Sequence, residues 1–127
     1  MDPASTQPTI LLVDDEDALR EVLADFLRDC GYNIVSARSG GEAVQLFVKN
    51  RPDLILSDVR MPDGDAIFLL SKLRLLGDYP PVILISAHSD ISENETLRLG
   101  AVRLIKKPFD LNTLLEAVRS CLPQSKT

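Results

Sequence analysis

The stretch LILSDVRMPDGD, residues 54–65, places a carboxylate at the end of the most hydrophobic strand candidate in the chain. Residues that favour burial lead directly into Asp58, and the Met-Pro-Asp-Gly sequence at 61–64 is typical of a turn. An ionised group at the edge of a hydrophobic core is unfavourable unless something compensates its charge. The role of Asp58 therefore depends on which residues the rest of the fold brings beside it.

Strand-like runs alternate with helix-like segments along the whole chain. Strands are predicted at residues 9–13, 33–37, 53–57, 81–86 and 102–106. In the intervening segments apolar residues recur at spacings of three and four, which indicates amphipathic helices. The first apolar face includes Val22 and Cys30, and the third ends with Leu76.

Several residues are typical of helix ends. Gly31 is expected to end the first helix. Ser89 or Asp90 is predicted to cap the fourth helix, and Asp110 is predicted to cap the fifth.

This order of elements indicates an α/β fold with a single five-stranded parallel sheet and five helices on both faces. Runs such as ILLV and VILI show no apolar–polar alternation, as expected for strands covered on both sides. At 127 residues the chain fits one domain. We expect that domain to span residues 9–122, with a disordered lead-in at 1–8 and a tail or the start of a linker at 123–127.

Polar residues follow the predicted strands at their carboxyl ends, where open α/β sheets bind ligands. They are Asp14 and Asp15 after the first strand, Asp58 after the third, Ser86 after the fourth, and Lys106 and Lys107 after the fifth. Each alone could be a cap or a solvated surface residue. Three neighbouring carboxylates repel one another, however, and Mg²⁺ bound by carboxylates, water and a phosphate oxygen offsets that repulsion.

A lysine and a hydroxyl at the same edge supply a positive charge and a neutral donor for a phosphate. A carboxylate there can act as a nucleophile and form an aspartyl-phosphate. The residues therefore predict phosphoryl transfer, with Asp58 as the group that is modified.

Composition excludes several other classes of function. The net charge is −5 and no Lys/Arg stripe stands out, so direct binding of nucleic acid by this domain is not expected. No apolar run approaches the roughly 20 residues needed to span a membrane, and no secretion signal is visible, so the cytoplasm is expected. Cys30 and Cys121 are expected to be small buried hydrophobes and not a disulfide.

The motifs ILLVDDED, LILSDVRMPDGD, ILISAHS and LIKKPF together resemble the four signature stretches of the receiver domain of bacterial two-component response regulators. The resemblance spans about residues 9–122. It implies the flavodoxin-like strand order 2-1-3-4-5, one of the two common orders of open α/β sheets. It also implies a phosphorylation-dependent signalling switch that is not an enzyme, apart from assisting its own phosphorylation and dephosphorylation.

The resemblance assigns a role to each residue at the strand ends. Asp58 is the implied phosphoacceptor, Asp15 a direct Mg²⁺ ligand, and Asp14 part of the acidic pocket. The carbonyl of Arg60 completes the metal shell. Ser86 and Lys107 contact the phosphoryl group, and the Lys107–Pro108 peptide bond is implied to be cis.

Partners also follow from the resemblance. A sensor histidine kinase is the implied phosphoryl donor, and a separate C-terminal output domain is a further implied partner. The face formed by the fourth helix, the fifth strand and the fifth helix allows a homodimer. One departure concerns this face, because Leu104 stands where the family usually has an aromatic residue whose rotation transmits the signal.

A haloacid-dehalogenase-like phosphatase is the alternative enzyme, since it also uses an aspartate nucleophile at a strand end. It requires a second aspartate two residues later, where this chain has Arg60. The pair Asp15 and Asp17 has the right spacing, but Leu19 occupies the place of that family's threonine or valine.

Two further alternatives are a flavin-binding module and a degenerate receiver. A flavin module requires a loop rich in Gly, Ser and Thr after the first strand, and the acidic DDED would repel a phosphate there. A degenerate receiver acts without phosphorylation, but every chemically required residue is present. The only histidine, His88, lies in a predicted loop and is not expected to be a phosphohistidine donor.

Overall fold

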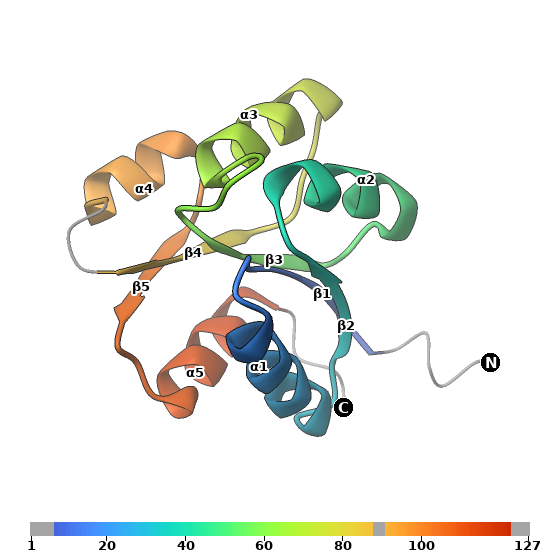
Figure 1. The fold of residues 1–127 in the computed structure, drawn as a ribbon, viewed down its shortest axis with the longest axis vertical. Helices are drawn as coiled ribbons and strands as arrows, with labels where there is room; N and C mark the ends of the chain where they lie inside the picture. Colours follow the sequence, from blue (N-terminus) through green and yellow to red (C-terminus); the bar gives the residue numbers. More distant parts are fainter. Residues whose placement is uncertain (1–6, 88–90, 123–127) are drawn as a thin grey trace.

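The computed structural model describes residues 7–87 and 91–122. The strands are β1 (Thr9–Val13), β2 (Asn33–Ala37), β3 (Leu54–Asp58), β4 (Val82–Ala87) and β5 (Arg103–Lys107). The helices are α1 (Asp17–Asp29), α2 (Gly40–Asn50), α3 (Ala66–Leu76), α4 (Glu93–Leu99) and α5 (Leu111–Cys121). All neighbouring strands are parallel, in the order β2-β1-β3-β4-β5 (Figure 1). The predicted fold class and strand order are confirmed.

The sheet separates two layers of helices. Helices α1 and α5 cover one face, and α2, α3 and α4 cover the other (Figure 1). Ile10 and Leu12 of β1 pack in the core beneath α1 and α5, whereas Leu11 and Val13 pack in the core beneath the other three helices. Because both faces of the strand are buried, both sets of side chains are apolar, which explains the uninterrupted hydrophobic run.

The third strand ends one residue later than predicted and includes the carboxylate at its tip. Asp58 pairs with Ile85 of β4, and the Val59 amide donates to the Ile85 carbonyl at 3.0 Å. The fourth and fifth strands are likewise shifted by one residue, because their last pair is Ala87 with Lys107. The backbone of Asp58 is therefore held by the sheet itself.

Ser92 caps α4, so the prediction of Ser89 or Asp90 as the cap is wrong. The Ser92 hydroxyl accepts from the Glu95 amide, and the Glu95 carboxylate accepts from the Ser92 amide, each at 3.1 Å. This reciprocal capping box satisfies two backbone donors, whereas a lone hydroxyl would satisfy only one. Ser89, Asp90 and His88 lie outside the described residues. The Asp110 cap of α5 is confirmed by its 2.8 Å hydrogen bond from the Thr113 amide.

Some residues that were predicted to be buried are exposed. Val22 is 55% exposed and Leu76 is 48% exposed, so the predicted apolar faces are wider than the faces that the two helices bury. Cys30 and Cys121 are unpaired, as expected, but they are only half-buried. No helix within the described ranges is long and apolar enough to cross a membrane.

Candidate functional site

Asp14 and Asp15 leave the carboxyl end of β1 in different environments. Asp14 is buried, its amide donates to the Ala37 carbonyl at 3.0 Å, and its carboxylate accepts from the Glu16 amide at 2.8 Å. Arg20 donates to the Asp14 carbonyl at 2.7 Å. Asp15, in contrast, is exposed. One carboxylate is thus fixed by the backbone and its neighbour is open to solvent.

Asp58 and Lys107 form an ion pair across the sheet edge. The Lys107 Nζ lies 3.5 Å from an Asp58 carboxylate oxygen, and their side chains are 27% and 14% exposed. The two residues come from β3 and β5, on either side of β4. The Lys107–Pro108 peptide bond is cis, which confirms the prediction.

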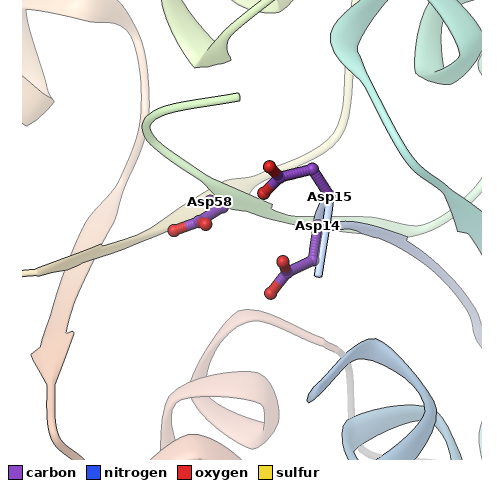
Figure 2. Close-up of side chains that lie close together, drawn as sticks. All are labelled: Asp14, Asp15 and Asp58. Carbon is purple, nitrogen blue, oxygen red and sulfur yellow. The ribbon is translucent and has the colours of Figure 1, made fainter. Parts of the chain in front are cut away.

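The three carboxylates converge at this edge. Each of Asp14, Asp15 and Asp58 contributes an oxygen, and these oxygens all lie within 4.8 Å of one another (Figure 2). Burial raises the pKa of the Asp58 carboxyl from 3.8 to about 6, while Lys107 lowers it and Asp14 raises it. Burial also raises the pKa of Asp14, against the lowering effect of the Glu16 amide. At neutral pH the site therefore holds more negative charge than Lys107 alone neutralises.

This donor set fits a hard divalent cation. Such ions prefer carboxylate and carbonyl oxygens, and Mg²⁺ typically takes only one or two carboxylates and keeps several waters. Asp15 and Asp58 offer two carboxylate oxygens close enough to bind one ion. The ion would also offset the charge of Asp58, which burial disfavours. Asp14 is less available because one of its oxygens already accepts from Glu16.

The contacts of two predicted site residues do not test the roles assigned to them. The Ser86 side chain is fully buried, and its hydroxyl donates to the Ala87 carbonyl at 3.3 Å. Within the described part of the chain no hydrogen bond joins it to Asp58 or Lys107. Arg60 lies two residues beyond Asp58, in the loop between β3 and α3, with an exposed side chain. The assigned roles of the Ser86 hydroxyl and the Arg60 carbonyl stay predictions.

The sequence predicted the turn at 61–64, but sequence reasoning missed the two glycines of α2 that hold it, Gly40 and Gly41. Gly64 has φ +106°, the conformation expected of a glycine, and the preceding Asp63 also lies in the left-handed region at φ +58°. The amides at the start of α2 hold both: Gly40 donates to the Gly64 carbonyl at 2.7 Å and Gly41 to the Asp63 carbonyl at 3.4 Å. The adjacent glycines Gly40 and Gly41 were the sequence feature that could have indicated this close approach.

Gly40→Ala is expected to displace the loop after Asp58. A Cβ at residue 40 would lie 2.7 Å from the Gly64 oxygen, a backbone atom that cannot rotate away. Overpacking of this kind costs about 1–3 kcal/mol, so the free energy of unfolding in urea should fall by that amount. Gly41→Ala is the matched control, because its nearest contact would be an ordinary 3.6 Å. Equal effects of the two substitutions would contradict the proposed clash.

The sequence of this chain matches the model of a known protein family. The family model of the response regulator receiver domain matches residues 10–119. The chain therefore belongs to the response regulator receiver family, whose members act as phosphoacceptor switches in two-component signalling.

Individual relatives agree with this assignment. The chain is 40% identical over 114 residues to the response regulator MprA of Mycobacterium sp. (strain KMS), covering 89% of this chain and 50% of that protein. It is 33% identical to the sporulation initiation phosphotransferase F of Bacillus subtilis (strain 168), covering 90% of this chain and 93% of that protein. The chain thus spans about half the length of the MprA relatives that it matches.

Solved structures show the same fold. The chemotaxis protein CheY4 of Vibrio cholerae superimposes with a TM-score of 0.83 at 30% identity, covering 91% of this chain and 99% of that one. The receiver domain of NtrX from Brucella abortus gives a TM-score of 0.83 at 29% identity, with the same coverage.

Proposed function

We propose that Asp58 accepts a phosphoryl group from the phosphohistidine of a sensor histidine kinase. The observation that carries the proposal is the Asp58 carboxylate beside one lysine and two further carboxylates at a strand end. Its ionised form is the nucleophile. An Asp58 oxygen bonds to phosphorus while the bond between phosphorus and the donor nitrogen breaks, and the nitrogen keeps the electron pair.

Lys107 is proposed to contact the phosphoryl group that is transferred to Asp58. Its ammonium lies 3.5 Å from the Asp58 carboxylate and keeps that carboxylate ionised against the effect of burial. The same charge stabilises the phosphoryl oxygens when they arrive. Ser86 is proposed to donate to one of those oxygens, which requires its hydroxyl to exchange the Ala87 carbonyl for the new acceptor.

Asp15, Asp58 and the Arg60 carbonyl are the groups proposed to hold Mg²⁺, with Asp14 contributing to the acidic pocket. When bound, the ion supplies positive charge that neutralises the carboxylates and the phosphoryl oxygens. The chain's own part is to hold Asp58 at the end of β3 and to fix the loop through α2.

Asp15→Asn is expected to stabilise the metal-free protein and to remove its thermal response to Mg²⁺. The substitution removes one of three mutually repelling charges, so the Tm without metal should rise. Saturating Mg²⁺ should raise the Tm of the parent through binding to the folded state, but not that of the variant. Asp78→Asn, at an exposed site after α3, is the control. An undiminished Mg²⁺ response in Asp15→Asn would exclude Asp15 as a ligand.

The chain is proposed to be a signalling component and not a general enzyme, one that assists only its own phosphorylation and dephosphorylation. The face of α4, β5 and α5 is the proposed dimer or partner surface, supported by the exposed apolar side chains of Leu97 and Val102. An output domain is a further proposed partner, since the MprA relatives are about twice as long as the matched region. Sedimentation of the chain with and without beryllofluoride tests the dimer.

The experiment that tests the function is phosphoryl uptake from acetyl phosphate. With Mg²⁺ the intact protein should gain the mass of one phosphoryl group, and the modification should survive acid and be lost in base. No gain in mass, with Mg²⁺ shown to bind by its effect on Tm, would contradict the proposal.

A further inference from the structure

Helix α3 is apolar on both its buried and its exposed sides. Toward the sheet it buries four side chains, those of Ala66, Leu69, Leu70 and Leu73. On its outer side Ile67 is 50% exposed, Phe68 37%, Leu75 80% and Leu76 48%. An exposed helix face is normally polar, and exposed apolar side chains grouped on one face often mark a contact with another molecule. Here Ser71 and Lys72 lie between the pairs Ile67–Phe68 and Leu75–Leu76.

A cavity of about 460 Å³ adjoins this face between α3 and α4. The two helices lie side by side on one face of the sheet (Figure 1). The apolar residues that line the cavity are Val59, Ile67, Ile91 and Leu99. Ile67 therefore belongs both to the cavity and to the exposed face of α3. The volume lies within the range of about 300–1,000 Å³ that is typical of ligand sites. The cavity is large enough to receive an apolar side chain from a partner.

The C-terminal end of α4 is fixed against α3. Arg74 of α3 donates to the Leu99 carbonyl and, at 3.3 Å, to the Arg98 carbonyl. Tyr79 donates to the Gly100 carbonyl at 3.2 Å. These bonds satisfy carbonyls at the end of the helix. They also keep this end of the cavity wall in place before any partner arrives.

Two cations near the cavity, Arg98 and Lys72, are available to pair with an acidic occupant. The cavity wall holds Arg60 and Arg98 and two carboxylates, each of which accepts a backbone amide at a helix start: Asp65 from Phe68 at 3.0 Å and Glu95 from Ser92 at 3.1 Å. The Arg98 guanidinium has no ion pair or hydrogen bond among the described residues. On the exposed face, Lys72 lies 5.4 Å from the Phe68 ring centroid and has no anionic partner within the described part of the chain.

We propose that this surface, the outer side of α3 with the α3–α4 cavity, binds an acidic amphipathic helix of a partner protein. An apolar side chain of that helix enters the cavity beside Ile67, and its carboxylates pair with Arg98 and Lys72. Helices bind such grooves through apolar anchors spaced three, four and seven residues apart. Val59 and Arg60 directly follow Asp58, so the occupant would contact the loop that carries the acidic site.

A second copy of this chain fits the surface less well. A two-fold interface brings the same patch together from both copies. Arg98 and Lys72 would then face a patch that offers the same cations, and the carboxylates in its cavity are engaged as caps. The charge pattern therefore favours a different, acidic partner.

The test uses the full, unphosphorylated chain, so its outcome does not depend on the proposed role of Asp58. The probes are two amphipathic peptides of about 18 residues with leucines at helical spacing, one flanked by glutamates and one by lysines. Peptide binding is measured by fluorescence anisotropy, and the contact surface is mapped by amide chemical shifts of labelled protein. The acidic peptide should bind more tightly, with shifts concentrated in α3, α4 and the loop after β3.

Matched substitutions locate the contact. Ile67→Glu and Arg98→Glu should each weaken binding of the acidic peptide about tenfold or more. Val48→Glu on α2 is the control for Ile67, since Val48 is 47% exposed, and Arg119→Glu on α5 is the control for Arg98. Thermal melts establish that each variant is folded, and Arg98→Glu should regain affinity for the basic peptide.

Three results would overturn the proposal. They are absence of binding, equal binding of the acidic and basic peptides, and binding that survives both substitutions at the cavity. A concentration-dependent dimer that disappears in Ile67→Glu would instead identify a second copy as the occupant and contradict the acidic partner.

Discussion

The Asp58→Asn variant is expected to take up no phosphoryl group from acetyl phosphate under conditions that fully modify the parent chain. Asparagine keeps the size of the side chain but has no ionised oxygen to attack phosphorus. The loss should be complete and not partial, because the proposed mechanism has no second acceptor. Intact mass measured after equal incubation with Mg²⁺ and acetyl phosphate checks this result.

The same substitution should stabilise the metal-free protein at neutral pH. The Asp58 carboxyl has its pKa raised from 3.8 to about 6 in the folded chain, so between these values the folded state binds more protons than the unfolded state. Stability that is fully present below the unfolded pKa is therefore lost as the pH rises through the folded pKa. The shift corresponds to about 3 kcal/mol at most, and Asp58→Asn should recover part of it at pH 7.

Urea unfolding at pH 5 and pH 7 without metal measures this effect. The parent should be less stable at pH 7 than the variant, and the difference between the two should shrink as the pH is lowered. Comparing the two proteins cancels groups that titrate alike in both, such as the exposed Asp17. A variant that is less stable than the parent at pH 7 would mean that ionised Asp58 is well compensated and would contradict the charge imbalance.

Lys107→Ala is expected to slow phosphoryl uptake by about 10²–10³, the usual effect of removing one group that stabilises transferred charge. Two consequences act together. The Asp58 carboxyl loses the cation 3.5 Å away that favours its ionised form, and the phosphoryl oxygens lose their nearest positive side chain. The rate of mass gain in acetyl phosphate, measured at several pH values, reports both.

Lys106→Ala provides the control within the same strand. Lys106 is exposed and pairs in register with Ser86, whereas its neighbour Lys107 contacts Asp58. Its removal should leave the rate of uptake nearly unchanged. Similar rates for both alanine variants would show that general surface charge, and not the Lys107 contact, promotes the reaction.

Much of the fold and of the acidic site follows from the sequence because these features rest on local patterns. Uninterrupted apolar runs predict covered parallel strands, and carboxyl ends of parallel strands meet at one edge, so Asp14, Asp15, Asp58 and Lys107 could be brought together in advance. The strand order required the family resemblance, since periodicity alone contains no information about which strands are neighbours.

The remaining features depend on tertiary contacts that local patterns do not encode. The hydrogen bond from Gly40 to Gly64 joins the start of α2 to the loop after β3, and α2 packs beside α3. The choice of Ser92 over Ser89 depended on Glu95 reaching back to cap it. In α3 the apolar spacing predicted the buried Leu73 correctly but also included Leu76, which is 48% exposed.

Reductive trapping of the phosphorylated chain tests the central claim most directly. Borohydride converts an aspartyl-phosphate to homoserine, with release of phosphate, so the acceptor is marked permanently at its own position. After incubation with Mg²⁺ and acetyl phosphate, followed by borohydride and peptide mass spectrometry, homoserine is predicted at residue 58 and at neither Asp14 nor Asp15. Homoserine at Asp14 or Asp15, or a phosphorylated chain with unmodified Asp58, would contradict the assignment.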